Sequence, residues 1–206
     1  NVYFYRLMQK LSLSDWKALA EKFGFGSITG VDIYGEKAGN VPGRSYLNKK
    51  YGKYGWAAGN FLTFIIGQGD LLVTPLQVVQ MMNIISTRGN TRTPHFYLDG
   101  VSEKVTLSLK SSTWDYLQNA TWEVINHNNG TGKAARTNGA IVHGKTGTAQ
   151  NPHGEDHSWF SGYISIDNEP KLSVAVLIEH GGKGSIEAAK ISREIFNFAN
   201  QNGILQ

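Results

Sequence analysis

The sequence has no cysteine among its 206 residues. Disulfide bonds and thiol catalysis are therefore excluded, and the redox compartment cannot be inferred from cysteine usage. Long apolar runs are also missing, because no stretch approaches the ~20 residues that a helix needs to cross a bilayer. No signal peptide is visible. The chain begins with Asn1 and the aromatic-rich residues 2–5, which predicts that the sequence starts inside a folded element.

Charge is sparse and only weakly biased. Charged residues make up 17% of the chain and the formal net charge is +4. No Lys/Arg cluster is dense enough to indicate a nucleic-acid partner, although the balance suits an anionic partner of another kind. With 40% hydrophobic residues, a chain of this length predicts one globular domain with its own core.

The first two thirds of the chain predicts helices and loops. Apolar residues recur at helical spacing from Phe4 to Leu11. A second short helix is expected to begin with Ser14 as its N-cap and to stop at Gly24. Residues 24–60 show no clear periodicity, so a long irregular connection is expected there.

The clearest helix start in the chain is the stretch Thr74–Gln77. Thr74 can cap the helix, Pro75 suits the first helical position, and Gln77 can close a capping box. The residues that follow are apolar nearly all round, which predicts a buried helix that ends at Gly89.

After Gly139 the pattern changes to strands. Runs of β-branched and aromatic residues bounded by turn residues predict three strands, at residues 140–149, 158–166 and 172–179. Helices are expected before and after them, at residues 112–126 and 186–200. An antiparallel three-strand meander flanked by helices is an α+β architecture.

The residues with the clearest chemistry lie on the first of these strands, in the stretch HGKTGTAQ from His143 to Gln150. Gly144 and Gly147 leave the backbone bare, so an extended peptide could pair with it as an added strand. Lys145 presents a cation, and Thr146 and Thr148 present hydroxyls, which together could hold a terminal carboxylate. The N–H of Thr148 could supply half of an oxyanion hole. A plain edge strand with a solvated lysine is the alternative, because a Lys-Thr-Gly triplet often occurs by chance.

Three stretches carry a resemblance to a known family. Residues 143–162 closely resemble the K-T-G strand and the following loop of class B penicillin-binding proteins. The segment with Gly67-Gln68-Gly69 and Thr74–Gln77 is similar to their G-Q-G…T-P-L-Q segment, and residues 1–5 look like the residues from the Asn of their S-x-N motif onward. The resemblance is strongest to the elongation type, penicillin-binding protein 2, and it implies a penicillin-binding/β-lactamase-like transpeptidase fold.

This resemblance implies a peptidoglycan D,D-transpeptidase that needs no cofactor. In such enzymes a serine attacks the D-Ala-D-Ala bond of one stem peptide, an amine from a neighbouring stem resolves the acyl-enzyme, and β-lactams trap the serine. By this resemblance the catalytic residues are Lys145, Thr148 and Asn1. The residues that it implies for substrate binding are Thr146, Gly147, Thr148, Gln150, Asp156 and His157.

The resemblance also implies partners and a location. The expected partners are peptidoglycan stem peptides, β-lactam antibiotics and a RodA-type glycan polymerase of the machinery that elongates the cell wall and sets cell shape. No nucleic acid is expected. The domain is expected in the periplasm of a bacterium, attached to the inner membrane only through an N-terminal anchor outside this sequence.

The sequence departs from the family pattern in one motif. The S-x-x-K that supplies the nucleophile and general base is expected upstream of Asn1, so residues 1–206 are expected to be the C-terminal portion of the transpeptidase domain and to be inactive alone. The single S-x-x-K string in the chain begins at Ser14 and ends at Lys17. It has no S-x-N after it and fits an N-cap better.

The loop after the K-T-G strand contains His153, Glu155, Asp156 and His157, which invites a metal hypothesis. The spacing is not H-E-x-x-H and Pro152 begins a turn, so no metal site is expected. Asp156 or His157 is expected instead to contact substrate or to order the loop.

Two other functions stay open. A β-lactamase shares the K-T-G strand, although no segment here resembles the glutamate-bearing loop of the class A enzymes. A non-catalytic penicillin-sensing or interaction module could use the same fold, because a fold does not fix a function. With the complete protein, a transpeptidase forms a long-lived penicillin adduct, a β-lactamase turns penicillin over, and an interaction module does neither.

Overall fold

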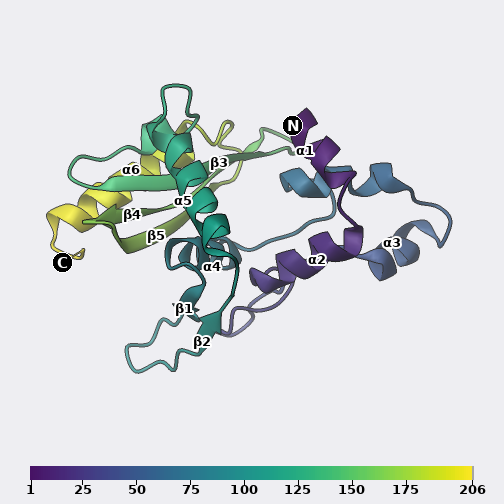
Figure 1. Ribbon diagram of the computed structural model, residues 1–206, viewed down its shortest axis with the longest axis horizontal. Helices are drawn as coiled ribbons and strands as arrows, with labels where there is room; N and C mark the ends of the chain where they lie inside the picture. The colour runs from purple at the N-terminus through teal and green to yellow at the C-terminus, as the bar shows by residue number, and fades with distance from the viewer. Residues whose placement is uncertain (206) are drawn as a thin grey trace.

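The computed structural model describes residues 1–205 as an α+β fold (Figure 1). Its centre is a three-stranded antiparallel sheet of order β3-β4-β5, formed by Ile141–Ala149, His157–Ile166 and Glu169–Ile178. Helix α6 (Glu187–Gln201) packs on one face of the sheet. Helices α4 (Pro75–Ser86) and α5 (Ser111–Asn126) pack on the other. The predicted meander flanked by helices is therefore confirmed.

The two faces of the sheet alternate along β4. Phe160 and Ile164 are fully buried in a cluster with Phe196 of α6. Tyr163, between them in register, points to the opposite face and packs with Met82 of α4. Since successive side chains of a strand point to opposite faces, this alternation lets one strand serve both helical layers.

The β4–β5 hairpin is tighter than the sequence predicted. Asp167 and Asn168 both have positive φ, 51° and 64°, which is the geometry of a two-residue type I′ turn. Strand β5 therefore begins at Glu169, three residues before the predicted start at Leu172. The pairing of β4 with β5 shifts in register between Ile164 and Ser165, close to this turn.

Helix α4 begins with the predicted capping box. Gln77 N donates to Thr74 Oγ1 at 3.2 Å, and Thr74 N donates to Gln77 Oε1 at 3.0 Å. The fully buried Gln77 also donates through Nε2 to Ser27 O and Ala38 O, both at 2.7 Å. The residue that starts the helix therefore also holds the long connection before it.

Helix α1 (Val2–Met8) and helix α2 (Leu13–Lys22) form at the expected places, but the predicted N-cap of α2 is wrong. Ser12 is the cap, and Ser14 lies within the helix. The hydroxyl of Ser12 accepts from Asp15 N at 3.0 Å and donates to Asp15 Oδ2 at 2.6 Å. These two hydrogen bonds cap the first turn of α2, so the helix begins two residues earlier than the sequence predicted.

The prediction of an irregular connection at residues 24–60 is also wrong. It contains helix α3 (Arg44–Tyr51) and the start of the 3-10 helix η1 (Ala58–Ile66). Helix α3 buries one residue, Leu47, which packs with Leu13 and Phe64, so it has no apolar periodicity to detect. Three short elements were also unpredicted: β1 (Asn90–Arg92), β2 (Lys104–Thr106) and η2 (Lys133–Ala135).

Buried apolar side chains of residues 1–205 form four clusters, two of which lie at opposite ends of the molecule. The larger cluster lies between the sheet and α6, whereas Leu13, Leu47 and Phe64 form a separate cluster with partly buried aromatic residues around them. Figure 1 shows these parts on opposite sides, with α1, α2 and α3 away from β4 and β5. No helix within residues 1–205 is long and apolar enough to cross a membrane.

Candidate functional site

Strand β3 lies at the edge of the three-stranded sheet and pairs only with β4 among the described strands. Its carbonyl groups at Val142, Thr146 and Thr148 instead accept hydrogen bonds from side chains. In an antiparallel strand the backbone groups of alternate residues point to the same side. The N–H and C=O of these three residues therefore face away from β4, toward the side where an added peptide would lie.

Lys145 extends from this edge. Its side chain is exposed, while its Nζ bends back to donate to Thr146 O at 2.5 Å. Partial burial of the ammonium against the strand lowers the pKa of Lys145. No ion pair within residues 1–205 includes Lys145. The site therefore contains a cation with no carboxylate partner in this part of the chain.

The two threonines of the motif contact neighbouring loops. Thr146 is buried, and its Oγ1 lies 3.0 Å from Thr131 Oγ1. Thr148 is exposed, and its Oγ1 accepts from Gly184 N at 3.3 Å. The backbone of β3 is thus held on both flanks, while the Thr148 N–H stays on the outward side of the strand.

The glycines of β3 have a different role from the one expected. Gly144 is buried, and a Cβ there would lie 2.6 Å from Phe160 Cζ. A Cβ at Gly147 would lie 3.1 Å from Trp159 Cβ. Both glycines allow β3 to pack closely on β4, and the outward edge is open because no strand pairs with it.

The loop after β3 is ordered by Asp156 and His157. Asp156 Oδ1 accepts from Asn151 N at 3.3 Å, and His157 Nδ1 accepts from His180 N at 3.0 Å. The two imidazole rings meet edge to face, with centroids 5.1 Å apart. These contacts fit the loop-ordering role among the two that were expected. Gln150 is exposed directly after the strand.

The same loop contains His153, Glu155, Asp156 and His157, all of which are residue types that can bind metals. Within residues 1–205, no group of three His, Asp or Glu side chains could hold a metal ion. His157 instead uses Nδ1 for the backbone of His180, and Asp156 uses its carboxylate for the backbone of Asn151.

Asn1 is exposed at the start of α1, which packs against η1. In Figure 1 the N-terminus lies on the same side of the molecule as the C-terminal end of β3. Ser14 and Lys17 lie elsewhere: they line a cavity of about 500 Å³ with Arg44 and without any residue of β3. The structure therefore does not bring this serine to the Lys145 strand.

A cleft of about 330 Å³ opens beside the end of β3. Its lining combines Thr148 and Gly147 with Gln68 and with apolar side chains such as Trp159. Gln68 was not assigned a role from the sequence. The signal that could have identified it is the pair of flanking glycines, both of which have positive φ in the structure, 77° and 78°.

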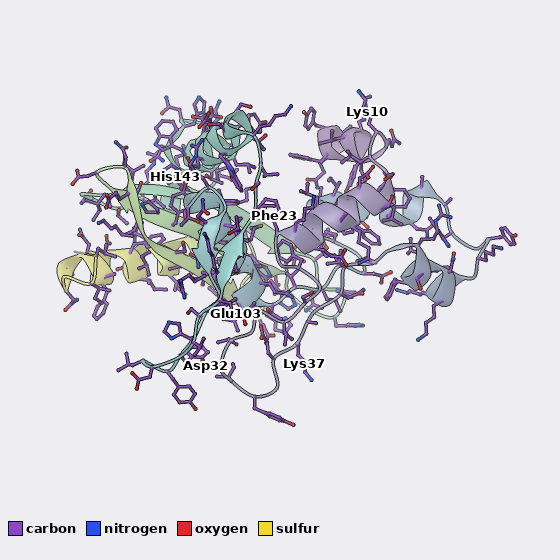
Figure 2. All side chains as sticks on the ribbon, turned by 60° about the horizontal axis from the view of Figure 1, so that its bottom comes forward. Lys10, Phe23, Asp32, Lys37, Glu103 and His143 are labelled. Carbon is purple, nitrogen blue, oxygen red and sulfur yellow. The ribbon has the colours of Figure 1, made fainter. Side chains whose placement is uncertain are left out.

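His143 anchors β3 from the helical side. Figure 2 labels His143 among the side chains. Its ring stacks on Tyr163 with centroids 4.5 Å apart, and its Nδ1 lies 3.1 Å from Gln118 O of α5. Burial lowers the pKa of His143, against the opposing effect of the Gln118 carbonyl. Burial also raises the pKa of Tyr163 to about 12. The pair is therefore neutral at neutral pH and supports the strand that carries Lys145.

Comparisons with known proteins agree with this geometry. The family model described as the penicillin binding protein transpeptidase domain matches residues 1–197. A peptidoglycan D,D-transpeptidase MrdA from Haemophilus influenzae is 32% identical over 96% of this chain and 34% of its own length. The chain therefore spans about a third of the length of the curated relatives it matches.

Solved structures extend the agreement to the fold. The Pseudomonas aeruginosa PBP2 in complex with WCK 5153 is 29% identical and superposes with a TM-score of 0.82, covering 95% of this chain and 44% of that one. The PBP2 of a Helicobacter pylori PBP2–MreC complex is 30% identical with a TM-score of 0.83, covering 97% and 38%. The expected resemblance to penicillin-binding protein 2 is thus confirmed, and the chain belongs to the penicillin-binding protein transpeptidase family.

Proposed function

We propose that this chain is the substrate-holding part of a peptidoglycan D,D-transpeptidase that cross-links stem peptides. The observation that carries the proposal is the free edge of β3, where Lys145 has no acidic partner within residues 1–205 and the backbone of Thr148 points outward. An extended peptide can pair with such an edge, and its terminal carboxylate can reach the ammonium group.

Each residue of the proposed site has its own role in acyl transfer. Lys145, with Thr146 and Gly147 beside it, orients the carboxylate of the terminal D-Ala. The N–H of Thr148 stabilises the oxyanion that forms when a serine Oγ attacks the preceding carbonyl carbon. The amide bond then breaks, D-Ala leaves with the proton taken from the serine, and an acceptor amine resolves the ester. Asn1 positions the acyl amide, and Gln150, Asp156 and His157 border the bound peptide.

The nucleophile comes from an S-x-x-K segment upstream of Asn1, and residues 1–206 are the C-terminal portion of the transpeptidase domain. Similarity to MrdA enzymes over nearly the whole chain supports this reading over a β-lactamase or an interaction module. The H. pylori relative in complex with MreC supports a role in cell-wall elongation. We therefore place the domain in the periplasm, anchored to the inner membrane, with a RodA-type polymerase as partner and β-lactams as inhibitors.

The test uses the protein extended upstream to include its S-x-x-K. Benzylpenicillin should form a long-lived adduct with the serine of that motif, seen as a mass shift, whereas residues 1–206 alone should form none. The substitution Lys145→Ala should slow acylation about 10- to 150-fold, the range for one hydrogen bond to a charged group.

The control is Lys171→Ala, at the far end of the sheet, where Lys171 pairs with Glu169. It should leave the acylation rate unchanged. Rapid turnover of penicillin by the extended protein, or an unchanged rate in Lys145→Ala, would contradict the proposal.

A further inference from the structure

Gln68 lies in a short segment that holds its backbone firmly. Gly67 N donates to Phe64 O at 3.0 Å and Gln68 N donates to Thr63 O at 3.1 Å, which closes the end of η1. On the other side, a Cβ at Gly69 would come within 2.8 Å of Thr63 Oγ1. Because both glycines also have positive φ, the chain fixes where the Gln68 side chain starts.

From this position the side chain reaches across to the free edge of β3. Gln68 Nε2 donates to Thr148 O at 3.1 Å, joining residues 80 positions apart in the sequence. Within residues 1–205 the Gln68 side chain makes no other hydrogen bond. The contact lies on the rim of the 330 Å³ cleft that also borders Gly147 and Thr148. It is therefore a single neutral hydrogen bond at the place where we propose that substrate binds.

The Thr148 carbonyl is a group that an added peptide needs. The N–H and C=O of Thr148 face the same way, so a strand that presents its carbonyl to the Thr148 N–H also presents an amide N–H to Thr148 O. In the structure that acceptor is already occupied by a side chain. The incoming N–H and Gln68 Nε2 approach it from the same outward side of β3.

The other capped carbonyls on this edge differ in kind. Asn126 Nδ2, which caps Val142 O at 2.9 Å, is also bonded within its own helix to Trp122 O at 3.0 Å. Lys145 caps Thr146 O with the ammonium of the site itself. Gln68 is held by one bond and comes from a loop, so its side chain can swing away at little cost.

We propose that the side chain of Gln68 is displaced when a peptide binds. In the free protein Gln68 Nε2 donates to the Thr148 carbonyl, and in the complex an amide N–H of the bound peptide donates to that carbonyl instead. Gln68 thereby affects specificity, because a ligand that brings its own N–H must displace the Gln68 hydrogen bond, whereas a ligand without an N–H leaves that bond in place. The inference rests on the proposed function, since it assumes that peptides bind at β3.

The experiment compares two β-lactams on the protein extended upstream to include its S-x-x-K. Benzylpenicillin carries an acylamino N–H beside the lactam ring, whereas a carbapenem carries a hydroxyethyl group there and no N–H. We expect Gln68→Ala to raise the acylation rate of benzylpenicillin relative to that of the carbapenem by about 2- to 12-fold, the range for one net hydrogen bond. The carbapenem rate also reports whether the variant is folded.

The matched control is Asn126→Ala, which removes an amide cap from the same strand at Val142 and should leave the ratio of the two rates unchanged. A ratio unchanged in Gln68→Ala would overturn the inference, because a purely structural role slows both ligands equally. A lower ratio would overturn it too, since Gln68 would then bind the ligand directly. If the unsubstituted protein formed no adduct with either compound, the proposed function itself would fail.

Discussion

At the scale of single residues, His143 shows how a buried ring couples the site to pH. Its folded-state pKa lies below the ordinary value of 6.5, chiefly because burial disfavours the charged form. As pH falls below that value, the unfolded chain binds a proton before the folded chain does. The free energy of unfolding therefore decreases from pH 6.5 down to the lowered pKa, and no further loss arises from this residue below it.

The substitution His143→Phe tests this prediction. Phenylalanine keeps an aromatic ring against Tyr163 and cannot titrate. We expect the original protein to lose more stability than the variant between about pH 7.5 and pH 5, the range in which histidine changes its charge. Urea unfolding of both proteins at the two pH values gives the comparison. Equal losses would show that the acid sensitivity arises elsewhere.

The residues of the site were predictable in unequal measure. Lys145 and Thr148 were identified because their side chains and their motif spacing already carry chemistry. The burial of Thr146 against Thr131 was not predictable, because it depends on how the loop before β3 folds back. Gln68 belongs to a motif visible in the sequence, but its contact was not predictable, since its partner is a backbone carbonyl 80 residues away.

At the scale of elements, the start of α4 does more than begin a helix. Gln77 accepts from Thr74 N through Oε1 and donates from Nε2 to Ser27 O and Ala38 O. A single buried amide thus satisfies a helix terminus and two loop carbonyls. Because buried carbonyls are costly to leave without partners, we expect this residue to hold residues 27–38 in place.

The substitution Gln77→Glu separates the two roles. The carboxylate can still accept from Thr74 N, but it cannot donate to the two carbonyls and it places a charge in a buried site. We expect a loss of about 2–4 kcal/mol in the free energy of unfolding, from two unpaired acceptors and the buried charge. Thr74→Ser, which keeps the capping hydroxyl, is the control and should cost less than about 0.5 kcal/mol. Equal stabilities of the two variants in urea unfolding would contradict the assignment.

Prediction of elements succeeded where the local signals agreed with the tertiary structure. The capping box at Thr74 is local and formed as predicted. A turn was also expected between the second and third strands, but it consists of Asp167 and Asn168 alone, because β5 already begins at Glu169. Helix α3 was missed because its burial rests on Leu47 alone, which only the packing with Leu13 and Phe64 makes apparent. The predicted N-cap at Ser14 was wrong because the hydroxyl that accepts from Asp15 N is that of Ser12, two residues earlier.

At the scale of the whole molecule, the separate cores predict uneven stability. Strand β4 is paired on both sides and has both faces covered, whereas α2 belongs to the small cluster around Leu13 and Phe64. We expect the amides of α2 to exchange with solvent through a smaller opening free energy than those of β4. Native-state hydrogen exchange of residues 1–206 measures this difference. Uniform protection across both parts would show one cooperative unit instead.

The capped edge of β3 has a consequence for how copies of this protein behave in a concentrated solution. A bare outer strand invites the same strand of a neighbouring molecule to align with it, and this is how many β-rich proteins aggregate. Here side-chain amide and ammonium groups already donate to three of the outward carbonyls, so a strand of a neighbouring molecule has few free carbonyls to pair with. This arrangement disfavours self-association through β3, whereas a short peptide can still bind by displacing one side-chain donor.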